Sequence, residues 1–352
     1  MEQQYPPGTQ ENYNSFSSRN PITEKGNETE FPEGAGGGKG YRGHEVTSTL
    51  RCEAPLREPP VPPSSPAKKI KHIVMSGGGV AGFSFYGALR ESSKRGVWSM
   101  SDIETVYGTS AGALFGLIIA LKYDWDTLDD YIIKRPWQNI FNFNIQNIFT
   151  IFTMRGIFDV KIMEEIFMPL FKGKDIPIDI TMKDFYESTG IDMHLFSTNI
   201  NDFTHIEFSY KTHPDWRIID AVYCSSCLPI LFRPVMIEDK CFTDGGMICN
   251  YPLKYCIENG ADPEEIFGLC RKPVVKLNYN VTADCSLFDY ILNIFYKTTE
   301  KVLNNTENIK ISHELFIDCP PLSVSDVFNA SSKVEERMRL IQVGVDNYLA
   351  GL

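Results

Sequence analysis

The chain has 352 residues, of which 43% are hydrophobic and 22% charged, so it is neither fibrous nor wholly disordered. The net charge of -11 argues against nucleic-acid binding and against docking on an anionic membrane by charge alone. The nine cysteines are scattered, residues 1–30 lack an apolar secretory signal, and the longest apolar run, 112–121, is too short to cross a bilayer. We expect an intracellular protein, cytoplasmic or peripherally membrane-bound, that is not secreted and has no transmembrane segment.

Residues 1–68 are rich in glycine, proline and serine and poor in large apolar side chains. Burial cannot offset the entropy of ordering such a segment, so we predict a disordered tail. Its proline-rich end, 55–66, is either an extended linker or a recognition segment. The composition changes after this tail. We expect one large domain over 69–325 and a C-terminal helix over 326–352 that packs on it.

Strands and helices alternate along the rest of the chain. Strands are expected at 70–75, 105–108, 193–200, 205–210, 265–271 and 309–319, with a hairpin over 233–243 that turns at 238–240. Helices are expected at 83–95, 111–122, 217–226, 251–259, 287–303 and 332–350, the last with a capping box between Ser332 and Glu335. This alternation predicts an α/β sheet with helices on both faces.

The first motif is the sequence SGGGVAG at 76–82, between a strand and a helix. Its backbone N–H groups suit an anion, either a cofactor phosphate or a transient oxyanion; alternatively, the glycines only permit tight packing. A dinucleotide site needs an acidic residue after the second strand, whereas Asp102 and Glu104 precede it. We therefore expect no cofactor.

The second motif is GTSAG at 108–112, between a strand and an apolar helix. This is the setting of a nucleophile elbow, in which the flanking glycines allow a sharp turn that exposes the Ser110 hydroxyl. The alternative is a serine that caps a buried helix. The third motif, FTDGG at 242–246, places Asp244 at the end of a strand, with a simple turn aspartate as its alternative.

Together these motifs resemble the patatin-like phospholipase family over roughly residues 70–260. The matching features are SGGGVAG, GTSAG, DGG, the segment Cys224-Ser225-Ser226-Cys227-Leu228-Pro229 with Phe232-Arg233-Pro234-Val235, and Asn250 and Pro252 after Asp244. One position departs: the family usually has a basic residue before the last glycine of the loop, and here it is Ala81. Electrostatic help from that side chain is therefore absent, while the backbone donors remain.

The resemblance implies a three-layer α/β/α sandwich with a mostly parallel central sheet. It also implies hydrolysis of glycerolipid acyl esters, as in a phospholipase A, without a metal or cofactor. It implies Ser110 as nucleophile, Asp244 as general base and an acyl-enzyme intermediate. The oxyanion hole would come from the amides of Gly77, Gly78 and Gly79, and the motifs would be supported by Gly82, Gly108, Gly112, Gly245 and Gly246. The substrate would be a phospholipid or other glycerolipid at a membrane surface. The alternative is a catalytically silent lipid-binding or scaffold protein.

His313 and the Cys224–Cys227 pair are the rivals of this dyad. A Ser–Asp–His order is formally met by His313, but His313 lies in an apolar strand pattern, and a structural role is favoured. The Cys224–Cys227 pair ends a helix and has no second pair at zinc-like spacing, so no metal site is expected. Asp244 should be buried, because desolvation would raise its pKa and make it a better base.

Residues 137–158 are dense in phenylalanine and isoleucine with almost no charge. Two hypotheses remain open for this segment: a mobile cap that contacts lipid, or a buried pair of core helices. If the first is correct, replacing Phe149 and Phe152 by serine should weaken liposome binding and spare a soluble ester; loss of both properties would favour the second.

Overall fold

The computed structural model describes residues 68–142, 145–273, 281–303, 309–319 and 323–352. The predicted tail up to residue 67 lies outside the described residues. The strands are β1 (His72–Met75), β2 (Thr105–Thr109), β3 (Gly156–Phe158), β4 (Asp192–Asn199), β5 (Thr204–Phe208), β6 (Ile230–Phe232), β7 (Val235–Ile237), β8 (Lys240–Asp244), β9 (Ile266–Pro273) and β10 (His313–Cys319). The α-helices are α1 (Gly82–Lys94), α2 (Ala111–Ala120), α3 (Trp125–Asp129), α4 (Ile145–Met154), α5 (Lys161–Lys172), α6 (Met182–Thr189), α7 (Ile218–Ser225), α8 (Leu253–Glu258), α9 (Leu287–Leu303), α10 (Val324–Ser332) and α11 (Val334–Ala350).

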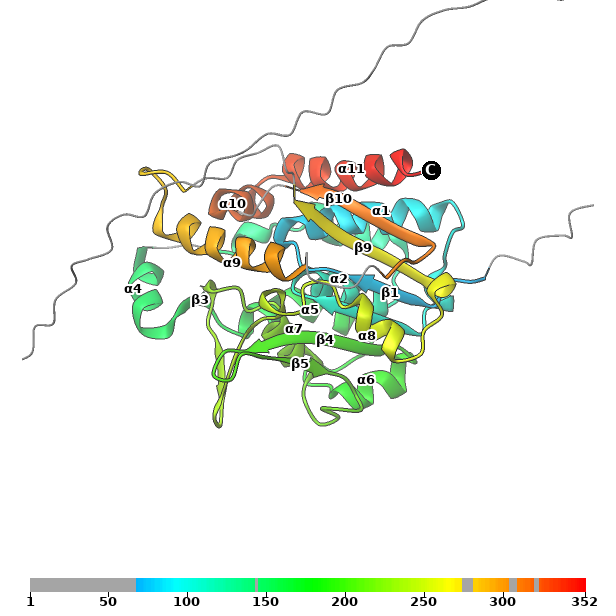
Figure 1. The fold of residues 1–352 in the computed structure, drawn as a ribbon, viewed down its shortest axis with the longest axis horizontal. Helices are drawn as coiled ribbons and strands as arrows, with labels where there is room; N and C mark the ends of the chain where they lie inside the picture. Colours follow the sequence, from blue (N-terminus) through cyan, green and yellow to red (C-terminus); the bar gives the residue numbers. More distant parts are fainter. Residues whose placement is uncertain (1–67, 143–144, 274–280, 304–308, 320–322) are drawn as a thin grey trace, which may run out of the picture. The chain divides into compact units, whose positions relative to one another are not determined.

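An eight-stranded, mostly parallel sheet organises the fold, in the order β10-β9-β1-β2-β4-β8-β7 with β5 also on β4 (Figure 1). The five strands from β10 to β4 are parallel to one another. Their carboxyl ends therefore meet at one edge, where loops that follow different strands can share a site. The sheet is completed by β5 and β8, which pair antiparallel with β4, and by β7, which pairs antiparallel with β8. A mixed α/β fold was predicted, and it is confirmed.

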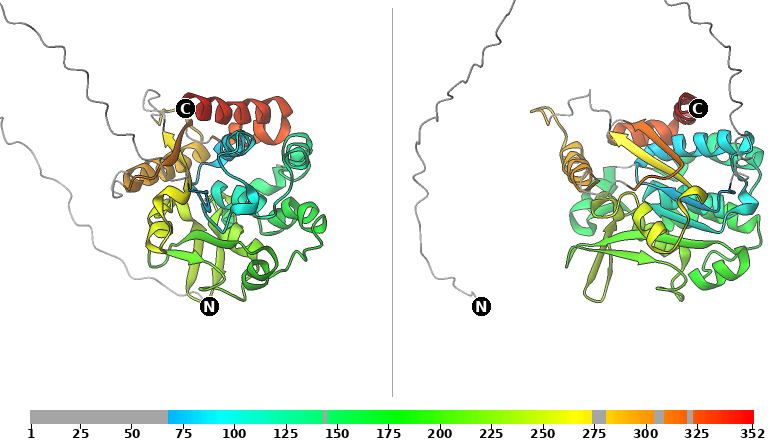
Figure 2. Two further views of the ribbon diagram at one scale, coloured as in Figure 1. Left: turned by 90° about the vertical axis from the view of Figure 1, so that its right-hand side faces the viewer. Right: turned by 45° about the vertical axis from the view of Figure 1, so that its right-hand side comes forward.

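Helices cover both faces of this sheet. Alternate residues of β1 point to opposite sides: Ile73 and Met75 join the main core with α1, α2 and α7, whereas Val74 joins a smaller core under α8. The layers follow from the two-residue period of a strand. On the outside of the first layer, α11 packs across α1 (Figure 2), and the Ser84 hydroxyl of α1 donates to the Leu340 carbonyl of α11 at 2.7 Å.

The C-terminal end differs from its prediction. The helix predicted over 332–350 is present as α11, which begins after Lys333 without a side-chain cap, but a separate helix, α10, precedes it within the C-terminal segment 326–352 that was expected to be one helix. The capping box predicted between Ser332 and Glu335 is wrong; Ser332 ends α10, and the box forms at Ser323 and Asp326 instead. The helices α3, α5 and α6 and the two-stranded sheet of β3 and β6 were not predicted. Among the described residues, every helix is too short or too polar to cross a membrane.

Candidate active site

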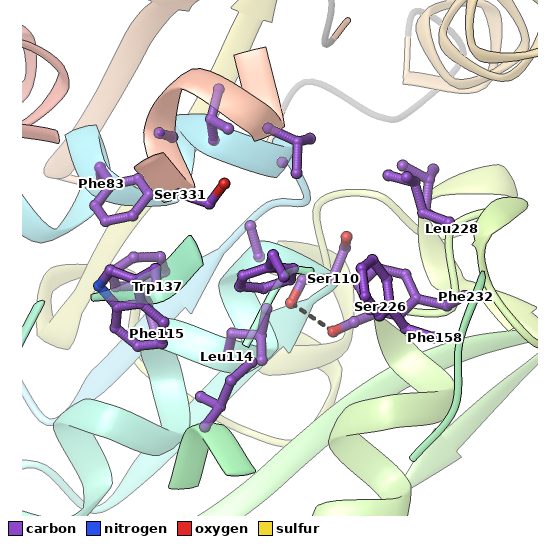
Figure 3. A pocket seen from close by; sticks show the side chains of 18 of the residues that line it. Phe83, Ser110, Leu114, Phe115, Trp137, Phe158, Ser226, Leu228, Phe232 and Ser331 are labelled. Carbon is purple, nitrogen blue, oxygen red and sulfur yellow. Dashed lines mark hydrogen bonds between the residues drawn. The ribbon is translucent and has the colours of Figure 1, made fainter. Parts of the chain in front are cut away.

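Ser110 stands at a sharp turn between β2 and α2. Its backbone has φ 54° and ψ -119°, the left-handed region that non-glycine residues rarely adopt. Two neighbouring serines hold this conformation: the Ser110 N–H donates to Ser225 Oγ at 3.1 Å, and Ser226 Oγ donates to the Ser110 carbonyl at 3.1 Å (Figure 3). Ser110 occupies the N-cap position of α2, but its hydroxyl makes no capping bond to the helix. The strained turn is the geometry of a nucleophile elbow.

Small residues are what allow this elbow to fit. A Cβ atom added at Gly112 would lie 2.4 Å from the Met75 carbonyl oxygen, so α2 could not pack this closely on β1 with any larger residue. Two other motif glycines face backbone: a Cβ added at Gly108 would lie 2.6 Å from the Gly112 oxygen, and one added at Gly245 would lie 2.1 Å from the Phe196 oxygen. Two more face side chains: a Cβ added at Gly82 would lie 2.3 Å from the Phe115 ring, and one added at Gly246 would lie 2.9 Å from Asn250 Oδ1. These glycines thus serve close packing.

The sheet brings Asp244 to the elbow from the opposite direction. β2 and β8 lie along the same edge of β4, because β5 occupies its other edge. β2 ends with Thr109 opposite Phe196, and the antiparallel β8 ends with Asp244 opposite Ser197, the next residue of β4. One residue along a strand is about 3.3 Å. The carboxyl ends of β2 and β8 therefore face each other, and this register makes Ser110 and Asp244 neighbours.

Asp244 is 1% exposed, and its two carboxylate oxygens have different surroundings. Oδ1 accepts a hydrogen bond from the Gly246 N–H at 2.8 Å, the turn contact that the alternative interpretation expected. Oδ2 is buried and has no hydrogen-bond partner of normal geometry. Burial raises the pKa of Asp244 to about 6, opposed by the hydroxyl of Ser110 and the amide of Gly246. The Ser110 hydroxyl is thus close enough to act on Asp244 without forming a well-aligned bond.

The glycine loop lies over this pair. A Cβ added at Gly77 would lie 3.2 Å from that of Ser110, and Gly79 lines the same cavity as Ser110 with a φ of 56°. The Gly77 amide donates to the Asn250 carbonyl at 2.9 Å, so it is not available as an oxyanion donor, contrary to expectation. Within the described residues, the amides of Gly78 and Gly79 have no acceptor. These two amides form the glycine cradle.

An apolar cavity of about 170 Å³ opens beside Ser110 (Figure 3). Apart from Ser110, Ser226, Ser331 and the Trp137 indole, the side chains around it are apolar; they include Phe83, Leu114, Phe115, Phe141, Phe158, Phe167, Leu228, Leu231 and Phe232. Helix α2 supplies one wall and the segment after α7 another. The cavity therefore suits a hydrocarbon chain rather than a polar ligand.

The rival residues do not converge on this cavity. His313 is the first residue of β10, at the amino end of a parallel strand and so at the opposite edge of the sheet from Ser110. None of the described histidines lines the cavity. Cys224 and Cys227 are buried free thiols, and burial raises the pKa of both, which disfavours the reactive thiolate. No cluster of metal-ligating side chains occurs among the described residues.

The segment 137–158 matches neither hypothesis as a whole. Its ends line the cavity: Trp137 is buried and Phe158 half-buried. Between them lies the single helix α4, on which Phe149 is 72% and Phe152 79% exposed. The core interpretation is therefore correct for the ends, and the exposed apolar surface expected of a lipid-contacting cap occurs on α4. Its mobility stays a prediction.

Comparisons with known proteins identify relatives of this chain. A model of the patatin-like phospholipase family matches residues 73–257. A probable lipid hydrolase, 463L, of Invertebrate iridescent virus 6 is 27% identical over 196 residues, 54% of this chain and 64% of that protein. The uncharacterized protein R571 of Acanthamoeba polyphaga mimivirus is 24% identical over 185 residues, 53% of this chain and 61% of that protein. The chain thus matches less than two thirds of the length of these relatives.

Among solved structures, VipD from Legionella pneumophila has 16% identity and a TM-score of 0.46, with 80% of this chain and 66% of that chain covered. ExoU from Pseudomonas aeruginosa, in complex with SpcU, has 12% identity and a TM-score of 0.39, with 80% and 52% covered. The family match covers just over half of the chain and contains Ser110, the glycine cradle and Asp244. This chain belongs to the patatin-like phospholipase family.

Proposed function

We propose that this protein is a lipid acyl hydrolase of the phospholipase A type, with Ser110 as nucleophile and Asp244 as general base. The observation that carries the proposal is the buried, unpartnered Oδ2 of Asp244 beside a strained serine at an apolar cavity. A carboxylate in this setting gains by taking a proton, and the nearby hydroxyl is the group that can give one.

In the first half of the reaction, Asp244 takes the Ser110 proton as Oγ attacks the acyl carbonyl carbon. The carbonyl oxygen becomes an oxyanion beside the amides of Gly78 and Gly79, and each such donor lowers the barrier by about 3 kcal/mol. The tetrahedral intermediate then collapses. The ester C–O bond breaks, and the proton on Asp244 passes to the departing glycerol oxygen, which leaves an acyl-Ser110 ester.

In the second half, Asp244 takes a proton from water, whose oxygen attacks the acyl-Ser110 carbonyl. The same cradle holds the second oxyanion, and collapse returns the proton to Ser110 and frees the fatty acid. A base with pKa about 6 is largely ionised at neutral pH and still basic enough to accept a proton in the transition state. No residue beyond this dyad is required for the proton transfers.

The surroundings favour a lipid over a small polar ester. The apolar cavity would hold the acyl chain next to Ser110. On α4, the exposed rings of Phe149 and Phe152 offer apolar anchors for a membrane surface, which the net charge of -11 does not provide. We therefore propose that the protein binds membranes peripherally and takes its substrate from them.

The test is covalent labelling with a fluorophosphonate probe, combined with fatty-acid release from a panel of phospholipids and neutral glycerides. We expect labelling to disappear in Ser110→Ala, and fatty-acid release to fall by about 10³-fold or more in Ser110→Ala and Asp244→Asn. Ser188→Ala is the control, since its hydroxyl only donates to the Phe185 carbonyl of α6 at 3.0 Å. Hydrolysis that persists in Ser110→Ala would refute the nucleophile. Lipid binding by a wild-type protein that neither reacts with the probe nor hydrolyses any lipid would favour the scaffold alternative.

A further inference from the structure

Arg271 of β9 is a buried cation that has no counterion among the residues that the structure describes. Arg271 is 4% exposed, and its Nε and Nη2 atoms are buried without a hydrogen-bond partner among the described residues. No carboxylate among the described residues forms an ion pair with it. A buried, unpaired guanidinium is costly, because it loses its hydration and gains no charge in return. Such a group indicates that an anion belongs beside it.

The position of Arg271 connects it to the glycine cradle. β9 pairs with β1, and the Arg271 N–H donates to Ser76 Oγ, at the start of the loop, at 2.8 Å. A Cβ added at Gly78 would lie 3.4 Å from Arg271 Cδ. The guanidinium carbon lies 4.7 Å from the centre of the Tyr296 ring of α9. The charged end of Arg271 is therefore held between the glycine loop and α9.

This placement separates Arg271 from the oxyanion at Ser110. The Cβ direction of Gly77 leads to Ser110, whereas that of the next residue, Gly78, leads to Arg271. The two side chains thus contact successive residues of the loop on different sides. Arg271 is not among the residues that line the cavity beside Ser110, so a second anion would meet it at Gly78, the loop residue next to Gly77. The loop itself has no cation, because its residues 76–82 are all uncharged, including Ala81.

We propose that Arg271 binds the phosphoryl group of a glycerophospholipid substrate while Ser110 attacks one of its acyl esters. This inference rests on the proposed hydrolase function and makes the substrate a phospholipid rather than a neutral glyceride. In a glycerophospholipid the phosphate and the acyl esters share one glycerol unit, so an anion sits a few bonds from the scissile carbonyl. The planar guanidinium can donate two parallel hydrogen bonds to phosphate oxygens from the edge of its plane, while its face lies on the Tyr296 ring.

The catalytic test compares dioleoyl phosphatidylcholine with dioleoylglycerol, which has the same acyl chains and no phosphate. In Arg271→Met, we expect the ratio of phospholipid to diacylglycerol hydrolysis to fall at least tenfold. Arg271→Lys keeps the charge but loses the planar fork, so its ratio should lie between those of Arg271→Met and wild type. Equal losses on both substrates, or an unchanged ratio, would overturn the proposal.

A binding test separates this site from the reaction. With Ser110→Ala protein, we expect glycerophosphocholine and inorganic phosphate each to raise the Tm by about 2–4 °C at saturation, and the rise to vanish when Arg271→Met is added. A rise with inorganic phosphate alone would identify a free-phosphate site and overturn the assignment to a lipid headgroup. Should the wild type hydrolyse no ester, the proposed function fails, while the Tm shift still decides whether Arg271 binds phosphate.

Stability distinguishes a ligand-binding role from a structural one. Removing an unpaired buried charge should leave the Tm of Arg271→Met at or above that of wild type. A large fall in Tm, together with loss of activity on both substrates, would show that Arg271 holds the fold together and would overturn the proposal.

Discussion

Asp244→Asn should abolish hydrolysis and, at neutral pH, stabilise the fold. In the native protein, burial raises the pKa of Asp244 from 3.8 to about 6. A group whose pKa is raised on folding stabilises the folded state fully only below its unfolded pKa, and this contribution is lost as the pH rises through the folded pKa. Wild-type protein therefore carries a cost at pH 8 that the uncharged asparagine does not.

The size of the cost follows from the two pKa values. At about 1.4 kcal/mol per tenfold change in acidity, a rise from 3.8 to about 6 corresponds to about 3 kcal/mol at pH 8. At pH 4 the folded carboxyl is protonated, and most of this difference has disappeared. The stability of Asp244→Asn relative to wild type should therefore be about 2–3 kcal/mol more favourable at pH 8 than at pH 4. Any packing effect of the amide itself cancels in this comparison.

The assay is urea unfolding of both proteins at the two pH values, with hydrolysis measured in parallel. Asp124→Asn is the matched control, because hydrogen bonds from Thr127 lower the pKa of that exposed carboxylate at the start of α3. Its substitution should have the opposite sign and cost stability at pH 8. Wild-type hydrolysis should decline below about pH 6 as Asp244 takes a proton. If Asp244→Asn is no more stable relative to wild type at pH 8 than at pH 4, the carboxylate is not desolvated, and the argument for it as a base fails.

Three other substitutions test separate parts of the structure. Gly112→Ala places a Cβ 2.4 Å from a backbone carbonyl oxygen of β1, so we expect the free energy of unfolding in urea to fall by about 2–3 kcal/mol and ester hydrolysis to slow. Burial lowers the pKa of His194, but hydrogen bonds to its two flanking carboxylates raise it more, so the net pKa lies above 6.5. The charged imidazole therefore stabilises the fold fully below pH 6.5, and this stabilisation is lost as the pH rises through the raised pKa. His194→Gln should destabilise the protein more at pH 5.5 than at pH 9, as measured by urea unfolding. Replacing Phe149 and Phe152 by serine should weaken vesicle binding in a sedimentation assay about tenfold and leave the hydrolysis of a soluble ester unchanged. Loss of both vesicle binding and soluble-ester hydrolysis would show that α4 supports the core.

The strands around the site could be predicted from the sequence because each is a short, buried run between glycines or turns. β2 was expected at 105–108 and extends over Thr105–Thr109, and the hairpin of β7 and β8 turns where it was expected. The C-terminal caps could not be predicted in this way. Ser332 and Glu335 have the right spacing for a capping box, but spacing alone does not tell where the chain changes direction.

The site shows a similar division. The hydroxyl and the carboxylate were recognisable, because glycines mark the turns on which Ser110 and Asp244 stand. Their meeting depends on β8 pairing with the part of the same β4 edge that β2 leaves free, and such pairing between distant segments cannot be read from local sequence. Arg271 was missed because it lies 195 residues from Ser76 within a strand. The signal was an arginine that directly follows the apolar run 266–270, together with a glycine loop that has no cation.

The unpartnered atoms explain how one arrangement can serve both halves of the reaction. In the proposed mechanism, the negative charge before attack is shared by the two oxygens of buried Asp244, of which Oδ1 accepts from the Gly246 N–H and Oδ2 has no partner of normal geometry. As the proton moves to Asp244, the same charge would appear on the carbonyl oxygen, opposite the amides of Gly78 and Gly79, which precede α1 and have no acceptor among the described residues. The charge thus moves from a poorly stabilised position to a well stabilised one without entering or leaving the site. Because catalysis depends on this difference and not on tight binding of the substrate, the stability lost at Asp244 lowers the barrier of each half-reaction.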